Sequence, residues 1–189
     1  RVFEVAGPLS HCSPVSTTLS PQRGLRQVVR QAFGVVLLLA APLRAAAPLV
    51  KDINTTPQVY SSSPGNITQV NLTIFFAAND GNRGMELWKT DGATVTLVKD
   101  INPGAGSSSP SNLTAVGDTL FFTANDGVSG SELWVSDGTE GGTAMVADIR
   151  PGSGTSSPGS LVNFNGTLFF RANDGSKGAE LWKSDGTRD

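Results

Sequence analysis

From residue 49 onwards, short apolar runs alternate with clusters of glycine, asparagine, aspartate, serine and proline. Short β-prone runs bounded by such turn residues predict strands, and glycine and proline recur too often for a helix. The best-defined strands are expected at 113–116, 119–123, 131–136 and 144–149. The turn Gly117-Asp118 and the glycine-rich stretch 137–142 separate them, so the pattern predicts four antiparallel strands in succession.

The same order of strands and turns occurs three times, over about 49–96, 97–144 and 145–189. The tryptophans of the three copies are 46 and 48 residues apart. A fixed period of this length indicates one supersecondary unit that stacks on copies of itself. The shared positions, which we expect to be structural, are Phe75, Phe121, Phe169, Glu86, Leu87, Trp88, Glu132, Leu133, Trp134, Glu180, Leu181 and Trp182.

Adjacent apolar pairs within the strands make both faces of each predicted sheet apolar. A sheet with one solvated face would alternate apolar and polar residues, whereas the blades of a β-propeller are covered on both sides. We therefore predict an all-β, propeller-type array of four-stranded blades, open or incomplete, with the tryptophans packed between blades. The segment Leu49–Ile53 repeats the fourth-strand sequence, so it is expected to close the ring by pairing with the last blade.

The Asn-Asp-Gly loops and the Pro-Gly…Ser-Ser-x-Pro crossovers are expected along one edge of the array, because alternate connections lie on the same side of a sheet. This edge would collect Asp80, Asp126 and Asp174. Flexible acidic loops suit Ca²⁺, and these three aspartates are the calcium candidates. The alternative is that Asn and Asp before glycine simply form turns by bonding their own backbone.

The first 47 residues have a different composition and are excluded from the predicted fold. Residues 1–23 are unassigned. Residues 24–47 resemble a secretory signal peptide, with a basic stretch, the apolar run 32–41 and small residues before Pro48. The alternative for the apolar run is a buried helix. The signal predicts secretion or a place on the cell surface, and the run is too short to span a membrane as a helix.

Charge and residue usage narrow the possible functions. The net charge of the whole chain is −2, but the part from residue 48 onwards has nine basic and fifteen acidic side chains. This excess of negative charge disfavours nucleic acid as a partner. The only histidine and the only cysteine are His11 and Cys12, which lie outside the repeats. The repeats therefore have no cysteine nucleophile and no histidine base. A motif glutamate and a loop aspartate could imitate a glycosidase pair. Because these residues recur in every copy, we predict that the protein is not an enzyme.

The pattern ANDG … G … ELW … SDGT … V-x-DI-x-PG … SS-x-P resembles the bacterial ELWxxDGT repeat family over Leu49 to Thr187. The resemblance implies exported, propeller-like proteins without an established activity, cofactor or catalytic residues. Three copies are fewer than the four blades of the smallest propellers. The chain is therefore expected to be a fragment, an incomplete gene or part of a ring completed by self-association. The predicted function is binding of a protein or glycan; the alternative is a structural segment, stiffened by calcium, of a larger surface protein.

Overall fold

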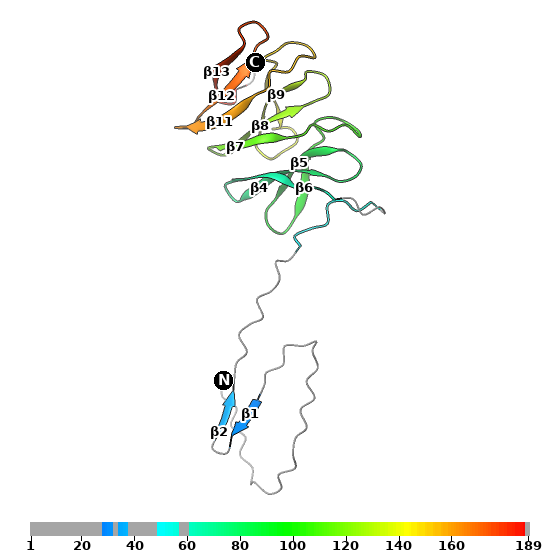
Figure 1. The fold of residues 1–189 in the computed structure, drawn as a ribbon, viewed down its shortest axis with the longest axis vertical. Coiled ribbons are helices and arrows are strands. Elements are labelled where there is room, and N and C mark those ends of the chain that lie inside the picture. Colours follow the sequence, from blue (N-terminus) through cyan, green and yellow to red (C-terminus); the bar gives the residue numbers. More distant parts are fainter. Residues whose placement is uncertain (1–27, 32–33, 38–48, 57–60, 188–189) are drawn as a thin grey trace. The chain divides into compact units, whose positions relative to one another are not determined.

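The computed structural model describes residues 28–31, 34–37, 49–56 and 61–187 (Figure 1). The chain divides into two units, Arg1–Pro48 and Leu49–Asp189. In the first unit, β1 (Val28–Gln31) pairs antiparallel with β2 (Gly34–Leu37). The alternative prediction of a buried helix is therefore wrong for the described part of the apolar run. Most of the predicted signal peptide, and all of residues 1–23, lie outside the described residues.

The second unit contains three antiparallel sheets, two with four strands and one with three. The first sheet contains, in order, β3 (Gly65–Val70), β4 (Thr73–Asn79), β5 (Met85–Thr90) and β6 (Val95–Lys99). The second contains β7 (Ser111–Val116), β8 (Thr119–Asn125), β9 (Ser131–Ser136) and β10 (Ala144–Ala147). The third contains β11 (Gly159–Phe164), β12 (Thr167–Asn173) and β13 (Ala179–Ser184).

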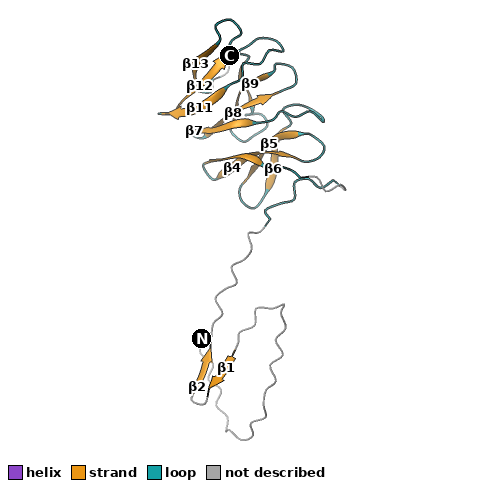
Figure 2. Ribbon diagram, viewed as in Figure 1, coloured by secondary structure: helices purple, strands orange, loops and turns teal. Residues whose placement is uncertain are grey.

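Figure 2 shows strands and loops only, and none of the described residues forms a helix. The prediction of an all-β fold is confirmed for these residues, and none of the three sheets closes into a barrel. No helix long and apolar enough to cross a membrane occurs in the described part of the chain.

Left-handed turn residues form the tight hairpins within the sheets. Asn165 and Gly166 join β11 to β12 with φ angles of 51° and 81°. Two consecutive positive φ angles are typical of a type I′ turn, for which Asn-Gly is the preferred sequence. Asn71 and Gly117 adopt φ angles of 52° and 58° in the corresponding hairpins of the other two sheets. The predicted hairpins are therefore present in all three copies.

Successive sheets pack face to face through the adjacent aromatic residues of their second strands. Because alternate side chains of a strand point to opposite faces, two consecutive residues can serve two interfaces. Phe75 and Phe122 lie in one buried cluster, shared by the first and second sheets. Phe121 and Phe170 lie in the next cluster, shared by the second and third sheets. Both faces of the middle sheet are therefore covered, as the paired apolar residues predict.

The first strands of successive sheets, β3, β7 and β11, are neighbours in space. Asn66 Nδ2 donates a hydrogen bond of 3.0 Å to the carbonyl of Pro110, and Asn112 Nδ2 donates one of 3.2 Å to the carbonyl of Pro158. Each amide side chain thus links one first strand to the start of the next. These contacts place the beginnings of the three sheets along one side of the unit.

The predicted role of Leu49–Ile53 as a strand is not confirmed. The segment is not assigned to a sheet and does not pair with β13. Leu49 and Val50 are 80% and 57% exposed, whereas Ile53 packs against the cluster that contains Trp88. The segment therefore contacts the first sheet, which it precedes in the sequence. Among the described residues the third sheet has three strands.

Candidate functional site

Glu86 lies near the start of β5 and its side chain is completely buried. Its Oε2 accepts hydrogen bonds from the amide of Ile101 at 2.9 Å and from the hydroxyl of Ser108 at 2.5 Å. Its Oε1 accepts the amide of Ser108 at 2.9 Å. These donors belong to the crossover, the segment that leads from the first sheet to the second. The Ser108 carbonyl accepts the amide of Asn125 in β8 at 3.0 Å, so the carboxylate fixes the junction between two sheets.

Glu132 forms the same arrangement one repeat later. Its carboxylate accepts the amide of Ile149 at 3.2 Å, the amide of Ser156 at 2.8 Å and the Ser156 hydroxyl at 2.5 Å. The Ser156 carbonyl accepts the amide of Asn173 at 2.9 Å. Glu180 has the same place in the third copy and pairs with Ala172 in the strand ladder, but it is exposed, and its carboxylate has no hydrogen bond to another described residue. We call the arrangement built around Glu86 and Glu132 the carboxylate site.

Burial raises the pKa of both Glu86 and Glu132 above the ordinary glutamate value. The hydrogen bonds from Ser108 and Ser156 oppose this effect, because they favour the ionised carboxylate. A raised pKa in a protein often marks a general acid. Here, however, Glu86 and Glu132 are both 0% exposed, so neither carboxylate can contact a substrate at the surface.

The calcium candidates Asp80, Asp126 and Asp174 each accept hydrogen bonds from their own loop. In every copy Oδ1 accepts the backbone N–H groups two and three positions later, at 2.7–2.9 Å. Burial opposes ionisation of the first two aspartates, but these donors outweigh it and lower the pKa. The N–H groups of Lys177 and Ser176 lower the pKa of Asp174. This is the geometry of an Asx turn, the alternative left open by the sequence.

The surroundings of the loop aspartates differ among the copies. Arg83 Nη1 lies 2.6 Å from Asp80 Oδ2, and Arg83 Nε lies 3.8 Å from Asp100 Oδ2. Near the second loop, the Ser129 hydroxyl donates to Asp126 Oδ2 at 3.2 Å. Among the described residues, no three His, Cys, Asp or Glu side chains are close enough together to hold a metal ion. The three candidate aspartates therefore do not converge on one site.

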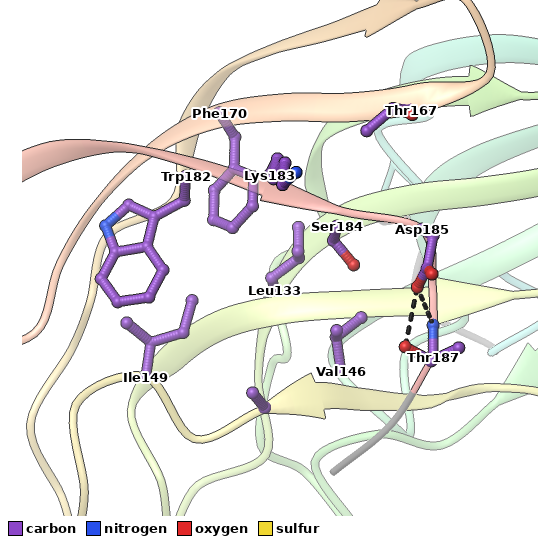
Figure 3. A pocket seen from close by; sticks show the side chains of 11 residues that line it. Leu133, Val146, Ile149, Thr167, Phe170, Trp182, Lys183, Ser184, Asp185 and Thr187 are labelled. Carbon is purple, nitrogen blue, oxygen red and sulfur yellow. Dashed lines mark hydrogen bonds between the residues drawn. The ribbon is translucent and has the colours of Figure 1, made fainter.

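A pocket of about 420 Å³ opens between the second and third sheets beside Trp182 (Figure 3). The indole N–H of Trp182 donates to the carbonyl of Ala172 at 3.1 Å, so the ring is held against its own sheet. At the polar end, Asp185 Oδ1 accepts the amide and the hydroxyl of Thr187 at 2.9 and 2.7 Å. The apolar wall consists of Leu133, Val146, Ile149 and Phe170.

The other two sheets show why this pocket exists. Leu97 of β6 is the cross-strand partner of Trp88, and Met145 of β10 is the partner of Trp134. Leu97 packs against the cluster that contains Trp88 in its own sheet, and Met145 packs against the cluster shared by the first and second sheets. Among the described residues, β13 pairs only with β12, and so no residue equivalent to Leu97 or Met145 stands on the other side of Trp182. The pocket lies where the fourth strand of the third sheet would place an apolar side chain.

Sequence reasoning placed the glutamates at the start of the tryptophan strands but missed their partners. Ser108 and Ser156 complete the carboxylate site, and both belong to the Ser-Ser-x-Pro motif of the crossover. The Ser-Ser-x-Pro motif recurs with the same period as Glu-Leu-Trp, and this shared period could have indicated that the serines contact the glutamates. Two polar motifs that recur with one period often meet in space when repeats stack.

Comparisons with known proteins do not assign the chain to a family: no family model, no curated protein and no solved structure matches it.

Proposed function

We propose that residues 49–187 belong to an exported, β-propeller-type repeat module that binds a protein or glycan at or outside the cell surface. The observation that carries this proposal is the use of the polar motif residues by the fold itself. Glu86 and Glu132 are buried hydrogen-bond acceptors, and the Asn-Asp-Gly aspartates accept the amides of their own loops. A motif whose polar side chains form hydrogen bonds within the fold is typical of a structural repeat and not of a catalytic centre.

Three features support the propeller-type arrangement. Antiparallel sheets follow one another along the chain, neighbouring sheets share buried clusters, and their first strands lie side by side. In a propeller the first strands surround the central axis and the blades cover one another's faces. The resemblance to the ELWxxDGT repeat family implies the same architecture and an exported protein.

The loops along one edge supply the surface for binding. A Cβ added at Gly84, next to an Asn-Asp-Gly loop, would clash with the crossover carbonyl of Gly106, and one added at Gly130 would clash with the carbonyl of Gly154. Loops and crossovers therefore form one polar edge held by rigid sheets, which is where binding residues usually lie. Backbone amides, hydroxyls and amide side chains on this edge can bond the hydroxyl groups of a glycan or the backbone of a protein.

A sedimentation assay tests the proposal. The full chain is mixed with insoluble cellulose, chitin or peptidoglycan, and both the pelleted protein and the released reducing ends are measured. We expect retention on at least one surface without release of reducing ends, and heat-denatured chain is the control. Release of reducing ends would contradict a non-catalytic role. Absence of retention on every surface would favour the structural alternative.

Mass spectrometry of secreted protein should find a new amino terminus between Ala47 and Leu49.

A further inference from the structure

A polar cleft of about 240 Å³ lies at the Asn-Asp-Gly loop of the first sheet, and we propose that it binds one ring of a neutral sugar. The side chains that line it are Asn54, Ser61, Asn79, Asn82 and Ala105, together with two glycines of the loop. The proposal rests on the binding role proposed above, and it names the class of ligand and its place on the polar edge.

Close contacts on two sides of the loop hold the walls of this cleft. A Cβ added at Gly81 would lie 2.7 Å from Asn54 Oδ1, in the segment that leads into β3. A Cβ added at Gly84 would clash with the carbonyl of Gly106, in the crossover that leads out of the sheet. The loop thus fits tightly between the segments before and after its own sheet. A cleft that is formed before the ligand arrives loses less freedom when the ligand binds.

The polar groups of the cleft are oriented but not used up by the fold. Asn79 Oδ1 accepts the amide of Gly81 at 2.7 Å, which leaves Asn79 Nδ2 as a donor without an acceptor among the described residues. Ser61 Oγ accepts the amide and the hydroxyl of Ser63 at 3.0 and 3.2 Å, so its own O–H can still donate. Asn82 is exposed, and its side chain offers both a donor and an acceptor.

These groups suit a ligand that is rich in hydroxyl groups and uncharged. None of the described lining residues carries a charge, and the neighbouring Arg83 is paired with Asp80 at 2.6 Å. A sugar hydroxyl both donates and accepts, so it can bond amide and hydroxyl side chains alike. A peptide needs pockets for its side chains, and Ala105 is the one apolar side chain in the described lining. The chemistry therefore favours a neutral sugar over a charged glycan or a peptide.

The size of the cleft limits how much of a glycan it holds. Sites for drug-sized ligands have about 300–1,000 Å³, and this cleft is smaller. It fits a single sugar ring, with the rest of a longer glycan outside. A ligand of that size forms few contacts, so we expect a Kd of about 1 mM.

The first copy alone combines these side chains. The four polar lining positions are 54, 61, 79 and 82, and their counterparts are 102, 107, 125 and 128 in the second copy and 150, 155, 173 and 176 in the third. The second copy has Val128 among them and the third has Arg150, so neither keeps four neutral polar side chains. A constellation that occurs once, on a frame that occurs three times, is typical of a ligand site and not of a structural motif.

Saturation-transfer NMR of the full chain tests the proposal. The neutral probes are the methyl glycosides of glucose, mannose, galactose and N-acetylglucosamine, the charged probe is glucuronate, and the peptide probe is N-acetyl-triglycine amide. We expect at least one neutral glycoside to bind saturably with a Kd of about 1 mM. Preferential binding of glucuronate or of the peptide would overturn the neutral sugar.

A tryptophan placed in the cleft locates the site. Ala105→Trp should fill the cleft and weaken binding of that glycoside at least tenfold. The matched control is Ser153→Trp, because Ser153 is the exposed counterpart of Ala105 in the next crossover, and binding should be unchanged there. Equal losses in the two variants would overturn the assignment to this cleft. Circular dichroism of both variants checks that the fold is retained.

A smaller change gives a second, independent readout. Asn82→Ala removes one or two neutral hydrogen bonds and should weaken binding by about threefold to tenfold. Ser176→Ala, at the equivalent exposed position of the third loop, should leave binding unchanged. Retention of the chain on an insoluble glycan, without binding of any neutral glycoside, would refute the cleft and leave the binding module standing. Saturable binding lost in Ala105→Trp, without retention on any insoluble surface, would support the cleft and refute a role at those surfaces.

Discussion

Replacing Glu132 by alanine tests the structural role of the repeated glutamate most directly. The variant removes the acceptor of three hydrogen bonds, from the Ile149 amide and from the amide and hydroxyl of Ser156. The serine hydroxyl can rotate toward another acceptor, but the two amides are fixed by the backbone. Ser156 is 0% exposed, so water does not easily replace the carboxylate there.

The expected loss follows from these contacts. Each buried donor left unpaired costs about 1–3 kcal/mol, and breaking a buried charged network costs about 3–5 kcal/mol. A domain of this kind has a total stability of about 5–15 kcal/mol. Glu132→Ala should therefore lose about 3–5 kcal/mol, which is large enough to unfold a marginal protein. Glu132→Gln keeps one carbonyl acceptor without the charge and should lose less.

The matched control is Glu180→Ala, because Glu180 has the same local sequence but is exposed. An exposed substitution usually changes stability by no more than about 0.5 kcal/mol. Urea unfolding at pH 7, followed by tryptophan fluorescence and far-ultraviolet circular dichroism, gives the midpoint and slope for each variant. Equal midpoints for Glu132→Ala and Glu180→Ala would refute the carboxylate site as a stabilising element.

Three further predictions concern packing, pH and backbone geometry. Trp134→Ala should lose about 3–5 kcal/mol, because the ring is 6% exposed between two sheets, and the half-buried Trp182→Ala should lose less; similar urea midpoints would contradict this. Stability should rise as the pH falls from 7 toward 4.5, because burial raises the pKa of both buried glutamates and protonation then favours the folded state. Below about 3.8 it should fall, because Asp80, Asp126 and Asp174 have lowered pKa values and must bind protons; urea midpoints that increase steadily from pH 3 to 7 would contradict this. Gly138→Ala should destabilise more than Gly92→Ala, since both have φ near 90° but an added Cβ would lie 3.1 Å from Phe75 only in the first; thermal melts compare the two.

The sequence by itself determined the strands, the turns and the burial of both faces of the middle sheet. These features depend on neighbours a few residues apart: alternation along a strand, left-handed turn residues and adjacent apolar pairs act locally. Phe121 and Phe122 therefore reveal two covered faces without knowledge of what covers them. Asn165-Gly166 likewise specifies its hairpin alone.

Only the tertiary structure decided what the repeated polar and fourth-strand residues do. Glu132 and Glu180 begin identical Glu-Leu-Trp motifs, yet one is buried and the other exposed. The difference is the crossover, whose Ile149 and Ser156 lie 17 and 24 residues further along the chain from Glu132. Leu49 and Leu97 likewise occupy the same position in the repeat. Leu97 packs against the buried cluster that contains Trp88, whereas Leu49 is 80% exposed. Burial and hydrogen-bond partners are properties of the assembled sheets, because desolvation requires a second surface that no local sequence contains.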